Sequence, residues 1–204
     1  MGDLVLAGAT SGTTTLTPTA VSGTTTLTLP ATSGTVLTSA NIGSNLPAGS
    51  VLQVVSAAKT DTFSTASTSA TDITNLSVSI TPSSASNKIL IMFNVNTSME
   101  NFQMSTFLVR NSTTIFVGDT AGSRVSATTA LCGVPAAGTN PFYISNLPNV
   151  GIYLDSPSST SSVTYKIQTK VNAGTGYVNR SYDDTDASYR GRTPSSITVM
   201  EVKG

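Results

Sequence analysis

The sequence predicts an all-β protein, in which an extended β-repeat segment precedes a jelly-roll-like β-sandwich, and three observations support this prediction. First, three copies of a Thr-rich phrase open the chain, and their Ser-Gly pairs begin at residues 11, 22 and 33. Second, short apolar stretches then recur at spacings of about 8–12 residues, which is typical of sandwiches and barrels. Third, no stretch keeps a 3.6-residue apolar period over three turns, so no long amphipathic helix is expected.

The composition agrees with this fold class. Only 10% of the 204 residues are charged, whereas about 25% is usual in a soluble domain. A chain that is poor in charge and rich in Thr, Val and Ile favours strands over solvated helices. Apolar residues make up 38% of the chain, which is enough to build a core, so the low charge does not indicate disorder.

Residues 1–49 form the predicted attachment segment. Its expected strands are short and are separated by Gly and Pro residues; they span 4–6, 13–17, 24–29 and 36–38. An eleven-residue repeat gives one strand and one turn, so its apolar side can be buried only against neighbouring repeats or neighbouring chains. We therefore expect a homotrimer, with attachment and trimer contacts made by the leucines of this segment. These are Leu4, Leu6, Leu16, Leu27, Leu29 and Leu37.

The alternative for this segment is a flexible low-complexity tail. Leu16 and Leu27 occupy the same position in successive repeats. A pure linker would not require that register, so the pattern favours the β-repeat.

Residues 50–204 form the predicted sandwich, after a connector at 40–50 that is rich in Gly, Pro, Asn and Ser. The expected strands span 51–55, 70–73, 76–80, 88–95, 104–110, 114–117, 125–131, 143–144, 150–154, 163–171 and 197–202. The stretch 88–95 is apolar enough to be interior on both faces, whereas 163–171 alternates apolar and polar residues. The predicted core residues lie on these strands: Leu90, Ile91, Phe93, Val95, Ile167 and Val199.

The sequence offers little chemistry, and we expect no catalytic residues, no cofactor and no metal. There is no histidine, which removes the commonest general base and zinc ligand. Cys132 is the only cysteine and has apolar neighbours, so neither an intramolecular disulfide nor an activated thiol is expected. Phosphate-binding glycine motifs are absent. These observations predict that the protein is not an enzyme.

Charge and hydropathy narrow the expected partners. The ten basic and ten acidic residues cancel, and no basic patch is visible, so nucleic acid is not an expected partner. No apolar run approaches the roughly twenty residues of a membrane helix, so membrane insertion is not expected. The first residues lack the features of a signal peptide, so assembly in a cytoplasm is expected.

The segment 176–192 differs from the rest of this charge-poor chain. It concentrates tyrosine and arginine, which are favoured at binding hot spots. Its candidate partner-binding residues are Tyr177, Arg180, Tyr182, Asp183, Asp184, Asp186, Tyr189, Arg190 and Arg192. Two alternatives remain open. The segment can be a polar loop ordered by Arg–Asp pairs across a subunit contact, or its aspartates can bind Ca²⁺ weakly, although the EF-hand pattern is not met.

Several stretches together carry a resemblance. They are 3–8, 22–31 and 34–37 near the start, and 49–55, 80–91 and 196–202 in the later part. The first group resembles the N-terminal segment of tailed-bacteriophage virion structural proteins of the fibre or appendage type. The second group resembles the globular domain of the same proteins, which are common in marine phages.

The resemblance implies a trimeric β-rich fibre, or a knob of jelly-roll type, attached to the virion through its N-terminus. It further implies assembly in the host cytoplasm and contact with other virion proteins of the tail, the portal region or the capsid. The exposed knob would contact a host-surface glycan or protein. A capsid decoration protein that stabilises the head is the alternative. An enzyme such as a glycan depolymerase is disfavoured, because such folds normally take a longer chain.

Overall fold

The computed structural model describes residues 4–7, 9–17, 26, 31, 33–34, 42–99, 103–132 and 146–204. The chain separates into two compact units, Met1–Asn41 and Ile42–Gly204. In the first unit, β1 (Leu4–Ala7) pairs antiparallel with β2 (Thr13–Leu16), and Leu4 lies opposite Leu16. These two strands were predicted. The strands expected at 24–29 and 36–38, with Leu27, Leu29 and Leu37, lie outside the described residues.

The second unit begins with a short helix, α1 (Ile42–Asn45), which the sequence did not predict. Two backbone hydrogen bonds tie the next residues to the end of the chain. Gly49 N donates to Lys203 O over 2.8 Å, and Lys203 N donates to Ser50 O over 2.8 Å. Residues 42–49 therefore group with the second unit. That the attachment segment ends at residue 49 stays a prediction.

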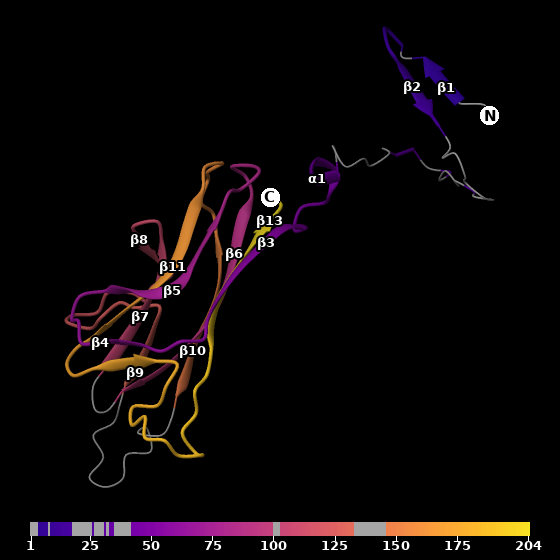
Figure 1. The fold of residues 1–204 in the computed structure, drawn as a ribbon. Helices are drawn as coiled ribbons and strands as arrows, with labels where there is room; N and C mark the ends of the chain where they lie inside the picture. The colour runs from indigo at the N-terminus through magenta and orange to yellow at the C-terminus, as the bar shows by residue number, and fades with distance from the viewer. Residues whose placement is uncertain are drawn as a thin grey trace. The chain divides into compact units, whose positions relative to one another are not determined.

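Among the described residues, six strands form the first sheet of this unit, which we call the β6 sheet (Figure 1). They are β3 (Val51–Lys59), β13 (Ser195–Val202), β6 (Lys88–Met99), β10 (Leu147–Asp155), β12 (Gly176–Val178) and β4 (Phe63–Thr65). One edge of β6 pairs with β10, and the other edge pairs with β13 and then with β12. Beyond these, β3 pairs with β13, and β4 pairs with β12.

The second sheet, which we call the β11 sheet, has five strands in the described part of the chain. They are β5 (Thr71–Ile80), β11 (Val163–Val171), β7 (Gln103–Arg110), β8 (Thr113–Ile115) and β9 (Thr129–Cys132). β11 lies between β5 and β7, while β8 and β9 share the other edge of β7. Every pairing in both sheets is antiparallel, so the all-β prediction is confirmed.

One apolar core lies between the two sheets. Burial alternates along β11 and β13, as expected for strands with one face on a core. Of the predicted core residues, five are buried in one cluster, and they are Ile91, Phe93, Val95, Ile167 and Val199. Leu90 was predicted wrongly. It is only half-buried, because β6 turns Ile89, Ile91 and Phe93 toward the core and Leu90 away from it.

Several strand predictions differ from the structure. The two strands expected at 70–73 and 76–80 are one strand, β5, which continues through a register shift against β11 and a left-handed Asn75 (φ 64°). The strand expected at 125–131 begins only at Thr129. β4 and β12 were missed, because three residues are too few to show an alternating pattern. The pair expected at 143–144 lies outside the described residues.

Candidate functional site

The segment between β12 and β13 is fixed at its base by the hydrogen bonds of one buried residue, Asn179, which we call the Asn179 anchor. Asn179 is fully buried and adopts the left-handed conformation (φ 64°), which Asn tolerates better than most residues. Its Nδ2 donates to Lys59 O over 2.8 Å and to Asp61 O over 2.9 Å, and its Oδ1 accepts from Ser195 Oγ over 2.5 Å. The base of the segment is therefore fixed to the end of β3 and to the start of β13.

Arg–Asp pairs order the segment above this anchor. Arg190 Nη2 lies 2.7 Å from Asp183 Oδ2. Arg192 binds Asp184 with two nitrogens, and its Nε lies 3.0 Å from Oδ1. Arg180 donates to the carbonyl oxygen of Tyr182 over 2.8 Å. The expected Arg–Asp pairing thus occurs within one chain, and whether the segment also touches another subunit stays a prediction.

Hydrogen bonding favours the ionised form of one of these carboxylates. Hydrogen bonds from the Thr185 side chain and backbone hold the pKa of Asp183 below its usual value, with a further contribution from the nearby Arg190 guanidinium. The group is exposed, so this shift says little about stability. Its effect is that the Asp183–Arg190 pair stays charged at a lower pH than an aspartate with the ordinary pKa of 3.8 would allow.

The aromatic residues of the segment form a surface with the arginines. The Arg180 guanidinium lies 4.3 Å from the centre of the Tyr177 ring, and the Tyr182 ring meets Tyr177 edge-on at 5.7 Å. Tyr189 is 66% exposed, and the Arg190 guanidinium lies 5.1 Å from its ring centre. We call these five residues, together with Arg192, whose side chain is 60% exposed, the loop surface. It offers rigid rings and cations together, as binding hot spots do.

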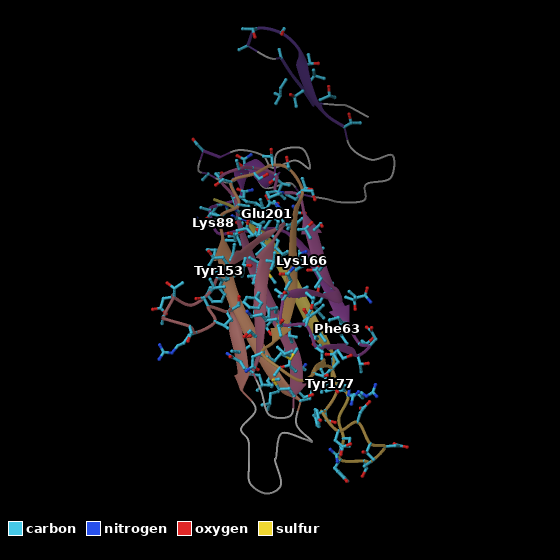
Figure 2. All side chains as sticks on the ribbon, turned by 90° about the vertical axis from the view of Figure 1, so that its left-hand side faces the viewer. Phe63, Lys88, Tyr153, Lys166, Tyr177 and Glu201 are labelled. Atoms are coloured by element: carbon cyan, nitrogen blue, oxygen red, sulfur yellow. The ribbon has the colours of Figure 1, made fainter. Side chains whose placement is uncertain are left out.

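The loop surface lies at one end of the sandwich. Figure 1 shows α1 and the C-terminus at one end of the second unit, and the yellow-orange segment before β13 at the opposite end. Figure 2 shows the same separation, because Glu201 and Tyr177 are labelled at opposite ends of the strands. The chain therefore enters the sandwich far from the loop surface.

The described residues contain no group of three His, Cys, Asp or Glu side chains placed to hold a metal ion. In the aspartate cluster, Asp183 and Asp184 bind arginines instead. Asp186 is exposed and lines a hollow of about 270 Å³ with Asp184, Arg190 and Arg192. Within the same described part of the chain, no helix is long and apolar enough to cross a membrane.

Glu201 is a buried carboxylate near the end where the chain enters the sandwich, and sequence reasoning did not single it out. It is 1% exposed. It accepts hydrogen bonds from Ser83 N, Asn87 Nδ2 and Gln53 Nε2, each over 2.6 Å. These neutral donors hold the 81–87 turn against β13 and β3. Each donor lies more than a hundred residues from Glu201 in sequence, so no local pattern could have revealed the cluster.

The hydrogen bonds at Glu201 make stability depend on pH. Burial alone would raise the pKa of Glu201, but hydrogen bonds from Asn87, Gln53 and Ser83 outweigh it and hold the pKa below its ordinary value of 4.5. The carboxylate thus stabilises the fold above the unfolded pKa, and this contribution declines as pH falls through the folded pKa. We expect Glu201→Gln to lower the free energy of unfolding by about 1–3 kcal/mol near neutral pH, because its amide faces donors.

Chemical denaturation at about pH 7 and about pH 3 measures this effect. The difference between wild type and Glu201→Gln should shrink at the lower pH, because this lies below the ordinary value of 4.5 and the unfolded wild-type chain then takes up a proton at this carboxyl. Asp186→Asn is the control, since it removes an exposed carboxylate. An equal difference at both values of pH would show that the pKa of Glu201 is the same in the folded and unfolded protein, and would contradict a stabilised carboxylate.

A second feature that sequence reasoning missed is the outer face of the β6 sheet. Val150, Ile152 and Leu154 of β10 are 62%, 67% and 47% exposed, and Val54 of β3 is 56% exposed. The signal was present in the sequence as the apolar stretch 88–95, which we assigned to the interior on both faces. Only its odd-numbered residues face the core, and the even-numbered ones extend this outer face.

The comparisons with known proteins found little. No protein-family model matches the chain, and no curated protein matches it. Among solved structures, it is similar to a chain in the structure of infectious bursal disease virus Gx strain, with a TM-score of 0.29 and 12% identity. The match covers 93% of this chain and 49% of that chain, so this chain spans about half of its length. Such a TM-score does not define a shared fold, so the function rests on the chain's own features.

Proposed function

We propose that this chain is a non-enzymatic structural protein of a bacteriophage virion, a fibre or appendage. Residues 1–49 attach it to the particle, and residues 50–204 form a knob that contacts the host. The observation that carries this proposal is the placement of two features at opposite ends of the knob. The chain enters at α1, and the loop surface lies at the opposite end (Figure 1). A knob held at the first end presents its tyrosines and arginines outward.

The strand order supports a jelly-roll knob. The main strands, numbered along the chain as β3, β5, β6, β7, β9, β10, β11 and β13, pair as β3-β13-β6-β10 and β5-β11-β7-β9. In order of sequence these sheets read 1-8-3-6 and 2-7-4-5. A double-sheet arrangement of eight antiparallel strands is the jelly-roll pattern, which is frequent in viral proteins.

The first unit supports association of several copies. Among its described residues, two strands form a hairpin, and Val5 and Leu6 are 54% and 52% exposed. An isolated two-stranded hairpin is at best marginally stable in water. Neighbouring chains would bury these apolar side chains and extend the pairing, and a closed ring of three copies is the association that we propose.

The loop surface is the proposed host-contact site, with a host-surface glycan or protein as its partner. Tyrosine and arginine supply large rigid area together with hydrogen bonds. The remaining partners in this proposal are other virion proteins, which bind residues 1–49. The protein acts in the virion, after assembly in the host cytoplasm, and neither binds nucleic acid nor inserts into a membrane.

We expect a particle that carries Tyr189→Ala and Arg192→Ala to lose adsorption to its host by about tenfold or more, the effect of removing a hot-spot pair. Both side chains are more than half exposed, at 66% for Tyr189 and 60% for Arg192. Arg192→Ala removes the exposed pair with Asp184, which contributes little to stability. The Asn179 anchor stays intact, so the melting temperature should change little. Adsorption assays and thermal unfolding check the two halves of this prediction.

Arg124→Ala is the matched control, since Arg124 is exposed and belongs to a different loop, between β8 and β9. Normal adsorption by the double variant would contradict the host-contact role. Cryo-electron microscopy of the particle then decides the location. Density for this protein on a tail or appendage supports the proposal, whereas many copies spread over the head would identify the alternative, a capsid decoration protein.

A further inference from the structure

We propose that the outer face of the β6 sheet is the interface between copies of this chain. The occupant of the face is thus a second copy. The inference rests on the proposed homotrimer for the existence of several copies, and it adds the surface through which their knobs associate. Four strands contribute three residues each to the face. They are Val54, Ser56 and Ala58 of β3, Ser196, Thr198 and Met200 of β13, Leu90, Met92 and Asn94 of β6, and Val150, Ile152 and Leu154 of β10.

The strand register places these residues in rows across the sheet. Leu154 lies opposite Leu90, Leu90 opposite Met200, and Met200 opposite Val54. This row is apolar on all four strands. In the next row, Ile152 lies opposite Met92. Directly opposed side chains on one face are in contact range, so the apolar positions form one continuous surface.

The twelve residues that define the face carry no charge, although they belong to a surface sheet. Lys88, at the start of β6, lies on the same side and borders the face. An antiparallel sheet with one free face normally places polar residues on that face. The exposed fractions of Val150 (62%) and Ile152 (67%) are large for aliphatic side chains. Contiguous apolar patches of this kind mark interaction sites.

The other sheet of the same knob shows what a solvated face looks like in this chain. On the outer side of the β11 sheet, Lys166 lies 2.8 Å from Asp72, and Gln168 donates to the same carboxylate over 2.7 Å. Ser79 and Thr164 share a hydrogen bond of 2.8 Å between their hydroxyl oxygens. The outer face of the β6 sheet has a similar hydroxyl pair, Ser56 and Thr198 at 2.9 Å, but none of its twelve residues forms an ion pair. The two outer faces therefore differ in their charged residues and in the exposed aliphatic side chains of β10.

The face is smaller than a standard interface between proteins. Four strands about 4.8 Å apart, with five residues each at about 3.4 Å per residue, cover roughly 330 Å² in projection. A standard complex buries roughly 800 Å² per partner, so this face would join copies that residues 1–49 already hold together. A hollow of about 440 Å³ lies on the face beside Met92, Val150 and Ile152. A side chain from the facing copy can fill it.

The chemistry favours a second copy over another protein. A patch without charge offers no electrostatic feature by which a different partner would be selected, whereas it is complementary to itself. The cation beside it, Lys88, already binds Ser156 Oγ over 3.0 Å in its own chain. Copies joined through residues 1–49 also meet at high effective concentration, which favours a further contact between their knobs.

Thiol accessibility in the full-length protein tests this inference. Ile152→Cys places a thiol on the face, and Ser77→Cys places one on the polar side of the β11 sheet. Ser77 is exposed and opposite Lys166. Both variants carry Cys132→Ala, so that each has one thiol. Sedimentation gives the oligomeric state, and a soluble maleimide gives the rate of reaction.

We expect the thiol at position 152 to react about tenfold or more slowly than the thiol at position 77 in the assembled protein, since an interface core excludes water. The two rates should converge on dilution to monomer. A stable assembly in which both thiols react equally fast would overturn this inference and leave the homotrimer standing. A monomer at all concentrations would contradict the homotrimer itself. Protection of position 152 only in intact virions would identify another virion protein as the occupant and overturn the inference too.

Discussion

Phe93→Ala is expected to lower the free energy of unfolding by about 3–5 kcal/mol, the usual cost of truncating a buried aromatic side chain. Phe93 lies on the central strand of the β6 sheet and is 5% exposed. It stands opposite Gly151 on β10 and opposite Ile197 on β13. A Cβ atom at position 151 would lie 2.4 Å from two carbons of the Phe93 ring. The ring therefore fills the space that the glycine leaves, and removing it opens a cavity between three strands.

Chemical denaturation of four variants measures this prediction. Gly151→Ala should destabilise the wild type, since its methyl group meets the ring, and should be tolerated better when Phe93 is already alanine. Phe116→Ala is the matched control, because Phe116 is 43% exposed and stacks on Tyr153 at a loop. Its loss should cost about 1 kcal/mol or less. Equal effects of Phe93→Ala and Phe116→Ala would contradict the core position of Phe93.

The sequence predicted most strands of the knob, because a two-residue alternation is a local pattern. Residues 163–171 alternate strictly, and β11 has the predicted bounds, Val163–Val171. The stretch 88–95 shows the limit of the same reasoning. A strand with apolar residues on both faces has the same sequence pattern whether its second face is buried or lies on an exposed apolar surface. Leu90 was therefore assigned to the core wrongly, while Ile91 was assigned correctly.

The sequence predicted which segment forms the candidate site, but not the contacts that its residues make. Composition was enough to single out 177–192. It could not show that Asn179 anchors the loop, because the partners of this residue, Lys59 and Asp61, lie far away in sequence. Nor could composition show that Arg190 and Arg192 form ion pairs with aspartates of the same chain. Such pairings depend on loop closure, which no spacing rule supplies.

The other large effect is expected at a buried polar group that joins the two sheets. Asp155 ends β10 in the β6 sheet and is 4% exposed. Arg110 of β7 approaches it with Nη1 at 2.9 Å from both carboxylate oxygens, and the hydroxyl of Tyr165 on β11 donates to Oδ2 over 2.7 Å. Burial, followed by the hydrogen bond to Asp155 and its charge, raises the pKa of the Tyr165 hydroxyl. The tyrosine therefore stays protonated and remains a donor.

Asp155→Ala is expected to lower the free energy of unfolding by about 2–4 kcal/mol, because it leaves a guanidinium and a buried hydroxyl without their acceptor. The Arg110 side chain is 29% exposed and retains some water, so the effect should stay below that of a fully buried ion pair. Tyr165→Phe removes one hydrogen bond only and should cost about 1 kcal/mol. Denaturation curves of the two variants give the comparison. If Asp155→Ala costs no more than Tyr165→Phe, the arginine contributes nothing, and apolar packing alone holds the sheets together.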